Sequence, residues 1–183
     1  MVLTKFHALP GFVQGHTLRR VDIACSAVAF RDEYAGSSFG RGCYRVLEVE
    51  ECAAWSRSAE RFFAKRMGQY QCFAQDWLGR LYVEDVDDGL VKLACHITDD
   101  VLNTEVDVCE FHNSLLPTSY SEIADVELFN QLLDRDGIQE LPKDRVYSLI
   151  RPLNLGGTFD ASNFQQGYAL VDWDLALQLK NQL

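Results

Sequence analysis

Two cysteine–histidine pairs are the residues whose types and spacing come nearest to covalent chemistry. Cys109 and His112 are three positions apart, and Cys95 directly precedes His96. A thiol beside an imidazole is the arrangement of a cysteine hydrolase, in which the histidine accepts the thiol proton. On a helix, however, Cys109 and His112 would share one face, and no third group would orient the histidine. The sequence therefore favours a buried cysteine and a core or capping histidine, and a small hydrolase is the alternative function.

The same four residues are also the types that bind zinc. Because neighbouring side chains on a strand point to opposite faces, Cys95 and His96 would not face one ion together. The run Asp85–Gly89 contains carboxylates, as a calcium loop does, but their spacing does not fit such a loop and the distal glutamate is missing. We therefore expect a turn there, no metal site and no cofactor.

Acidic side chains gather in the predicted turns that follow the central strands. These candidate binding residues are Glu84, Asp85, Asp87, Asp88, Asp99, Asp100, Glu105 and Asp107. If the sheet aligned these turns along one edge, they would form a negative strip that attracts a basic protein and speeds its association. The alternative is a set of solvated turns without a partner. A pair of carboxylates acting in hydrolysis is a further reading, but acids are too abundant here to single one out.

The segment Tyr70–Val83 is predicted to be a hairpin around which the other elements are arranged. Tyr70, Cys72 and Ala74 would share one face of the first strand, and Leu81 and Val83 one face of the second. Between the strands, Asp76 can accept hydrogen bonds from the backbone just after it, and Gly79 supplies a positive φ. Trp77 and Leu78 are too large for an idle loop and are expected to fold onto the core. Arg80 is expected to have a structural role, paired either with Asp76 or with a carboxylate from elsewhere in the fold.

The remaining pattern alternates helices and strands and predicts an α+β fold with a mostly antiparallel sheet flanked by helices. Helices are expected at 18–34, 50–66, 109–116, 121–134 and 171–179, and strands at 43–47, 90–97, 104–108, 146–151 and 164–170. Gly36 would cap the first helix, and Pro117 would interrupt the third. The chain of 183 residues shows no repeat or linker, so one domain is expected over 1–183, with 1–35 as its least defined part.

Composition narrows the function classes. The formal net charge is −10, which argues against a surface that binds nucleic acid. No stretch is long and apolar enough for a membrane helix, and the first residues lack the pattern of a secretory signal, so a cytoplasmic protein without a membrane partner is expected. The six cysteines lack metal-site spacing, and in a chain that can build a core they are expected to be buried, reduced thiols.

Several short segments, taken in order, resemble a known family. They are Phe39–Arg45 (FGRGCYR), Asp76–Arg80 (DWLGR), Glu110–Asn113 (EFHN), Pro152–Gly157 (PLNLGG), Asn163 and Trp173. In this order and spacing the chain is similar, over about residues 36 to 183, to the type VI secretion immunity proteins. The similarity is to the C-terminal domain of the proteins that protect bacteria against DNase effectors, formerly a domain of unknown function. One departure is the segment 93–98, which lacks a glycine-containing turn of many members.

The resemblance implies a cytoplasmic bacterial α+β protein, like the broader SUKH group of immunity proteins. It implies a non-catalytic activity, the binding and neutralising of a secreted nuclease toxin. Because the toxin-contacting surface varies between members, no binding residue is carried over by motif, and the acidic turns supply the candidate surface. A ligand-binding or scaffold domain whose toxin partner has been lost is the remaining alternative.

Overall fold

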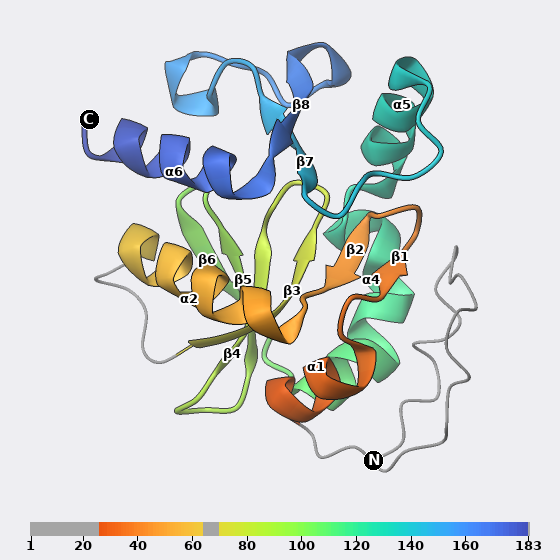
Figure 1. Ribbon diagram of the computed structural model, residues 1–183, viewed down its shortest axis with the longest axis vertical. Coiled ribbons are helices and arrows are strands. Elements are labelled where there is room, and N and C mark those ends of the chain that lie inside the picture. The colour runs from red at the N-terminus through yellow and green to blue at the C-terminus, as the bar shows by residue number, and fades with distance from the viewer. Residues whose placement is uncertain (1–25, 64–69, 183) are drawn as a thin grey trace.

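The computed structural model describes residues 26–63 and 70–182, and its centre is a six-stranded antiparallel sheet in sequence order (Figure 1). The strands are β1 (Ser38–Phe39), β2 (Tyr44–Val46), β3 (Tyr70–Asp76), β4 (Leu81–Asp85), β5 (Val91–Cys95) and β6 (Asp100–Asn103). A separate two-stranded antiparallel sheet joins β7 (Arg145–Leu149) to β8 (Phe164–Tyr168). The predicted α+β class with a mostly antiparallel sheet is therefore confirmed.

Helices cover both faces of the main sheet. They are α1 (Ala27–Tyr34), α2 (Val49–Phe63), α3 (Val108–Glu110), the π-helical turn η2 (Phe111–Leu115), α4 (Leu116–Ile123), α5 (Val126–Asp136) and α6 (Ala169–Lys180). Two short 3₁₀ turns, η3 (Leu153–Leu155) and η4 (Ala161–Asn163), lie between β7 and β8. One apolar cluster joins the sheet to α1, α4 and α5, and a second joins its other face to α2 and α6.

The central hairpin, β3 and β4, contributes side chains to the apolar clusters on both faces of the sheet. On β4, Leu81 and Val83 belong to the cluster under α2, and Tyr82 points into the opposite cluster, as the alternation predicts. On β3 the strict alternation is wrong, because the register shifts between Cys72 and Ala74. This irregularity places both Phe73 and Ala74 in the cluster under α1.

The N-terminal helix belongs to the same core. Ser26 caps α1, and Gly36 just beyond its end has a φ of +71°, as expected for the residue after a helix. Phe30 and Tyr34 of α1 are buried, whereas its apolar residue Val28 is exposed. The rest of the predicted helix 18–34, before residue 26, lies outside the described residues.

The region after β5 departs most from the sequence pattern. We expected a turn at 99–103 and a strand at 104–108, but the strand is β6, which pairs with β5 at the sheet edge, and 104–107 is the turn. The edge strand is largely exposed, so no buried alternation marks it. Pro117 does not end the helix at its own position. It lies in the first turn of α4, directly after the π-helical turn, and the helical backbone is interrupted two residues later, at Ser119, which has a φ of −119°.

The helical periodicity also missed a break between two helices. The predicted helix 121–134 is two helices, because the chain leaves the helical conformation at Ala124 and Asp125, and Asp125 has a φ of +48°. Tertiary hydrogen bonds to this link hold the break, as described below. The C-terminal helix α6 does not bury all of its apolar side chains. Trp173 is buried on it, but Val171 and Leu175 are exposed.

Four cysteines follow the prediction of buried free thiols, namely Cys43, Cys52, Cys72 and Cys95. The prediction is wrong for Cys109, which is disulfide-bonded. Scattered cysteines carry no spacing signal, because pairing depends on how closely the fold brings two Cβ atoms together. Cys25 lies outside the described residues. Within the described ranges, no helix has the length and apolar character needed to cross a membrane.

Candidate functional site

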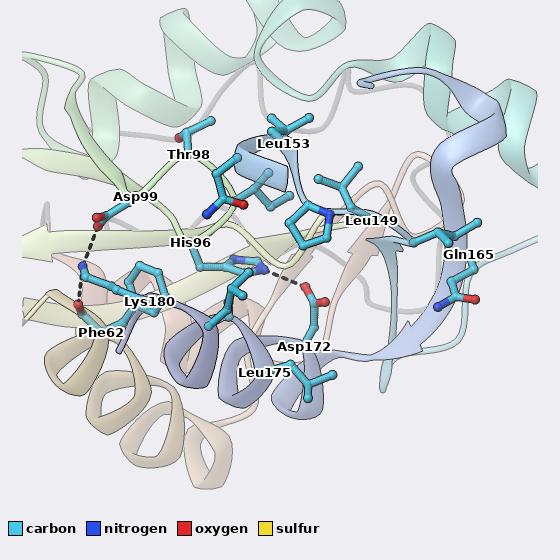
Figure 2. A pocket seen from close by; sticks show the side chains of 16 residues that line it. Phe62, His96, Thr98, Asp99, Leu149, Leu153, Gln165, Asp172, Leu175 and Lys180 are labelled. Atoms are coloured by element: carbon cyan, nitrogen blue, oxygen red, sulfur yellow. Dashed lines mark hydrogen bonds and ion pairs between the residues drawn. The ribbon is translucent and has the colours of Figure 1, made fainter. Parts of the chain in front are cut away.

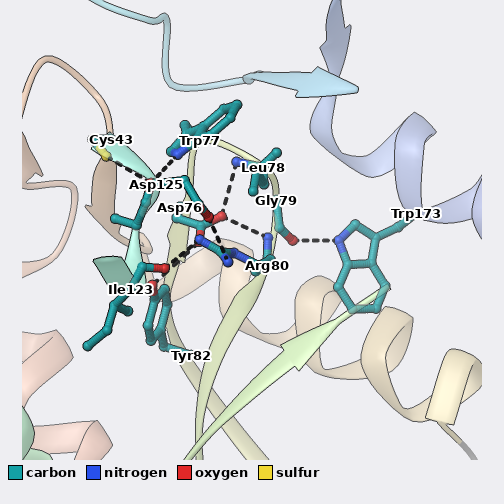
Figure 3. A network of polar contacts seen from close by, with 11 residues as sticks. Cys43, Asp76, Trp77, Leu78, Gly79, Arg80, Tyr82, Ile123, Asp125 and Trp173 are labelled. Carbon is teal, nitrogen blue, oxygen red and sulfur yellow. Dashed lines mark hydrogen bonds and ion pairs between the residues drawn. The ribbon is translucent and has the colours of Figure 1, made fainter. Parts of the chain in front are cut away.

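The turn between β3 and β4 is organised by one buried carboxylate (Figure 3). Asp76 is fully buried, and its Oδ1 accepts hydrogen bonds from the backbone N–H groups of Leu78 and Arg80, both at 3.0 Å. Its Oδ2 accepts from Arg80 Nε at 2.6 Å. Burial opposes the charge on Arg80, but the attraction of Asp76 outweighs it and raises the pKa of Arg80 above its ordinary value. The predicted Asp76–Arg80 pair is therefore present and structural in its contacts.

The same turn is tied to two distant helices. Arg80 Nη2 donates to the carbonyl of Ile123 at 2.7 Å, and the indole N–H of Trp77 donates to the carbonyl of Ala124. These bonds satisfy the carbonyls that the break between α4 and α5 leaves open. On the other side, Trp173 of α6 donates to the carbonyl of Gly79 at 2.8 Å. The segment Asp76–Arg80 thus joins the sheet, the α4–α5 link and α6.

Other segments that carry the family resemblance also hold the fold. Arg41 donates to the carbonyls of Ile138 and Gln139, and the buried Arg45 donates to those of Pro142 and Arg145, so the Phe39–Arg45 segment is fastened to the chain before β7. These contacts give the Phe39–Arg45 segment a role in holding the fold.

The Pro152–Gly157 segment has a similar explanation. Asn163 exchanges hydrogen bonds with the backbone of Arg151, at 2.9 Å and 2.8 Å, and so closes the loop between β7 and β8. A Cβ added at Gly157 would lie 1.9 Å from the Arg151 carbonyl oxygen, so only glycine fits there. The motif therefore marks a loop closure.

The Cys109–His112 pair is not arranged as a hydrolase dyad. Cys109 is in a disulfide and offers no thiol. His112 is fully buried. Its Nδ1–H donates to the Val108 carbonyl at 2.7 Å, and its Nε2 accepts from the Tyr44 hydroxyl at 2.9 Å. Burial lowers the pKa of His112 to about 3. His112 is a core histidine, as the sequence favoured.

Five of the predicted acidic residues share one end of the sheet, which we call the acidic end: Asp85, Asp87, Asp88, Glu105 and Asp107. The β4–β5 turn and the β6–α3 turn meet there, because Val91 at the start of β5 exchanges backbone hydrogen bonds with Thr104 and Val106. Lys92 lies among these acids, 2.7 Å from Asp88 and 3.9 Å from Asp85. Its hydrogen bond lowers the pKa of Asp88.

The other three predicted acids lie elsewhere. Glu84 is buried and accepts a hydrogen bond from the backbone of Ala27 at 3.0 Å, and its burial raises its pKa. Asp99 and Asp100 lie at the opposite end of the sheet, in and after the β5–β6 turn. The expectation of one continuous strip is therefore wrong, because successive turns of an antiparallel sheet fall at alternate ends.

A pocket of about 740 Å³ opens at that opposite end, between α6, the β5–β6 turn and the segment after β7 (Figure 2). Phe62, Leu149, Leu153, Leu175 and Leu179 give it apolar walls. Asp99 lies at one side and forms an ion pair with Lys180, whose Nζ is 2.6 Å from Asp99 Oδ1. The size and the mostly apolar lining are typical of small-molecule sites.

A histidine–aspartate pair forms part of the pocket lining. His96 Nε2 lies 2.6 Å from Asp172 Oδ2, and the side chain of His96 is almost completely buried. Its ring packs against Trp173, with ring centroids 4.6 Å apart. The pair links the β5–β6 turn to α6 across 76 positions of the chain.

Sequence reasoning considered His96 only beside Cys95 and missed Asp172 altogether. The available signal was the pair of acids, Asp172 and Asp174, flanking Trp173 in an otherwise apolar helix. Among the described residues, no group of three His, Cys, Asp or Glu side chains is placed to hold a metal ion.

Comparison with known proteins adds a fold relationship. No family model matches the chain, and no curated protein matches it. A crystal structure of Atu4351 from Agrobacterium tumefaciens is similar, with a TM-score of 0.57 and 14% sequence identity, over 78% of this chain and 69% of that one. At this identity, the likeness shows a shared fold.

Proposed function

We propose that this protein binds and neutralises a secreted nuclease toxin without catalysing a reaction, and that the acidic end is the surface that attracts the toxin. The resemblance of the motif segments to type VI secretion immunity proteins supports this proposal. The net charge of −10 supports it as well. The proposal places the protein in the bacterial cytoplasm, where an intoxicating nuclease would act on DNA.

The observation that carries the proposal is the meeting of two acidic turns at one end of the sheet. Asp87, Asp88 and Glu105 are exposed there, and Lys92 is the basic side chain that pairs with this group. A nuclease needs a basic cleft to hold DNA phosphates, and a surface rich in carboxylates competes for that cleft. Binding of this kind requires no catalytic residue.

The hydrolase alternative has no catalytic dyad at Cys109 and His112. Cys109 has no free thiol, and both ring nitrogens of His112 form hydrogen bonds within the core. The ligand-binding alternative has a specific observation in its favour, the pocket beside His96 and Asp172. That pocket is considered separately below.

The test is a DNA-cleavage assay with the purified product of any nuclease effector gene found beside the gene of this protein; the absence of such a gene would favour a scaffold domain that has lost its toxin. We expect cleavage to fall in proportion to added protein and to stop near one equivalent, because a blocking partner acts stoichiometrically. An unrelated basic nuclease serves as the specificity control and should stay active. Undiminished cleavage by the effector at a tenfold excess of protein would rule out neutralisation, and complete loss at a small fraction of an equivalent would indicate catalysis instead.

A further inference from the structure

The pocket at the β5–β6 turn combines apolar walls with four charged or titratable groups. Figure 2 shows His96 and Asp172 facing each other, with Leu175 beside Asp172 and Leu149 and Leu153 on the other side. Leu175 is 58% exposed, so an apolar surface continues onto the rim. Exposed apolar side chains around a hollow are the usual mark of a binding site.

The positive charge in the pocket is already compensated. Lys180 pairs with Asp99 at 2.6 Å, donates to the carbonyl of Phe62 at 2.9 Å and lies 4.4 Å from the centroid of the Phe62 ring. Its ammonium group is therefore held by a carboxylate, a carbonyl and an aromatic face. An anionic ligand would have to compete with Asp99 for it.

The carboxylate of Asp172 has no such counter-ion. None of the described lysines or arginines pairs with it, and the neighbouring Asp174 takes Arg61 instead, at 3.5 Å. Its partner is His96, whose other nitrogen, Nδ1, is buried without a hydrogen-bond partner among the described residues. A buried N–H without an acceptor is costly, so the contacts favour the tautomer with the proton on Nε2, donated to Asp172. The hydrogen bond from His96 occupies Oδ2 of Asp172 and supplies no lysine or arginine counter-ion.

We propose that this pocket binds a small organic cation, an amine whose apolar body lies against Leu149, Leu153 and Leu175 and whose ammonium group pairs with Asp172. The side chain of Asp172 is 17% exposed, so it is open to the pocket yet partly removed from water. A charge-assisted hydrogen bond in such a place is stronger than on an open surface. The volume of about 740 Å³ exceeds what one lysine side chain fills, which favours a free small molecule over a side chain of a partner protein. This site is separate from the acidic end, so it goes beyond toxin neutralisation.

The test uses three probes of one shape, 4-phenylbutylammonium, 4-phenyl-1-butanol and 4-phenylbutyrate, titrated into the full chain and followed by backbone amide chemical shifts. We expect the ammonium ion to shift the amides of Thr98, Leu153 and Leu175 and to bind about tenfold more tightly than the alcohol, as one charge-assisted hydrogen bond provides. The butyrate should bind most weakly. Nα-acetyl-lysine methylamide, which carries the same ammonium on a peptide unit, should bind more weakly than 4-phenylbutylammonium.

Three variants separate charge from shape. Asp172→Asn keeps an acceptor for His96 and should remove the preference for the ammonium ion over the alcohol. Asp174→Asn is the matched control on the same helix and should keep the preference. Leu175→Gln, at an exposed position, should weaken binding of the ammonium ion and the alcohol alike.

The proposal fails if the alcohol or the butyrate binds the wild-type protein as tightly as the ammonium ion, or if Asp172→Asn keeps the preference. It fails equally if none of the probes shifts the pocket amides. Binding of the lysine derivative at least as tight as that of 4-phenylbutylammonium would assign the pocket to a protein partner instead. Each outcome is independent of the nuclease assay, so either proposal can fall without the other.

Discussion

Replacing Asp76 with asparagine is expected to lower the free energy of unfolding by about 3–5 kcal/mol, the usual cost of breaking a buried ion pair. Asparagine still offers an oxygen to the backbone N–H groups of Leu78 and Arg80, so the turn can keep its shape. The Arg80 guanidinium, whose side chain is only 13% exposed, would lose the carboxylate that lies 2.6 Å from its Nε and would keep only the more exposed one of Asp125, 3.3 Å from its Nη1. An amide N–H placed against it would repel it further.

Urea unfolding of Asp76→Asn measures this cost. Asp32→Asn is the matched control, since Asp32 also pairs with an arginine but is 55% exposed, and its loss should cost within about 0.5 kcal/mol. We expect the variant to lose cooperativity between the sheet and α4 as well, because Arg80 also holds the carbonyl of Ile123, the last residue of α4. A cost below about 1 kcal/mol would show that Asp76 does not organise the turn in the way described.

Acidification is expected to destabilise the protein through His112. Burial lowers the pKa of His112 to about 3, against an ordinary value of 6.5. At a pH between these two values, His112 binds a proton in the unfolded chain but not in the folded protein. The free energy of unfolding therefore falls as the pH falls. The slope for this one group is about 1.4 kcal/mol per pH unit, and above pH 6.5 its contribution to the pH dependence vanishes.

The measurement is urea unfolding of the wild type and of His112→Gln between pH 7 and pH 4. Carboxylates also titrate toward the lower limit, so the difference between the two slopes, not the wild-type slope alone, reports His112. Tyr44→Phe is the control, because it removes the hydroxyl bound to Nε2 but leaves His112 buried. It should lower stability by a constant amount and keep the wild-type slope. Equal slopes for the wild type and His112→Gln would contradict the assignment of His112 as a neutral core residue.

Sequence periodicity predicted the parts of the fold in which burial is local. The helix α2, with Trp55, Ala59, Phe62 and Phe63 on its buried face, and the hairpin of β3 and β4 both follow from side-chain spacing. The strand β6 did not, because an exposed edge strand has no buried face to mark it. The break at Ala124 and Asp125 did not either, because carbonyl acceptors there are bonded by Trp77 and Arg80, about 45 positions earlier.

The candidate sites were less predictable than the fold. The eight acidic residues were chosen for being in turns, and the antiparallel order of strands then divided them between two ends and buried Glu84. The pocket was missed because its parts come from Phe62, His96, Leu149 and Asp172, which no local pattern brings together. Conversely, the motif segments that resemble a family, such as Asp76–Arg80, make contacts that hold the fold.

The most direct test of the central claim is the association rate of this protein with the nuclease toxin that it is proposed to neutralise, measured at low salt for two charge-matched triple variants. One variant carries Asp87→Asn, Asp88→Asn and Glu105→Gln at the acidic end. The other carries Glu122→Gln, Glu127→Gln and Glu140→Gln, which are also exposed but lie on and beside α4 and α5. We predict that the acidic-end variant associates about tenfold more slowly, that the other changes the rate less than about twofold, and that added salt removes the difference. Equal rates for the two variants would contradict the claim that the acidic end receives the toxin.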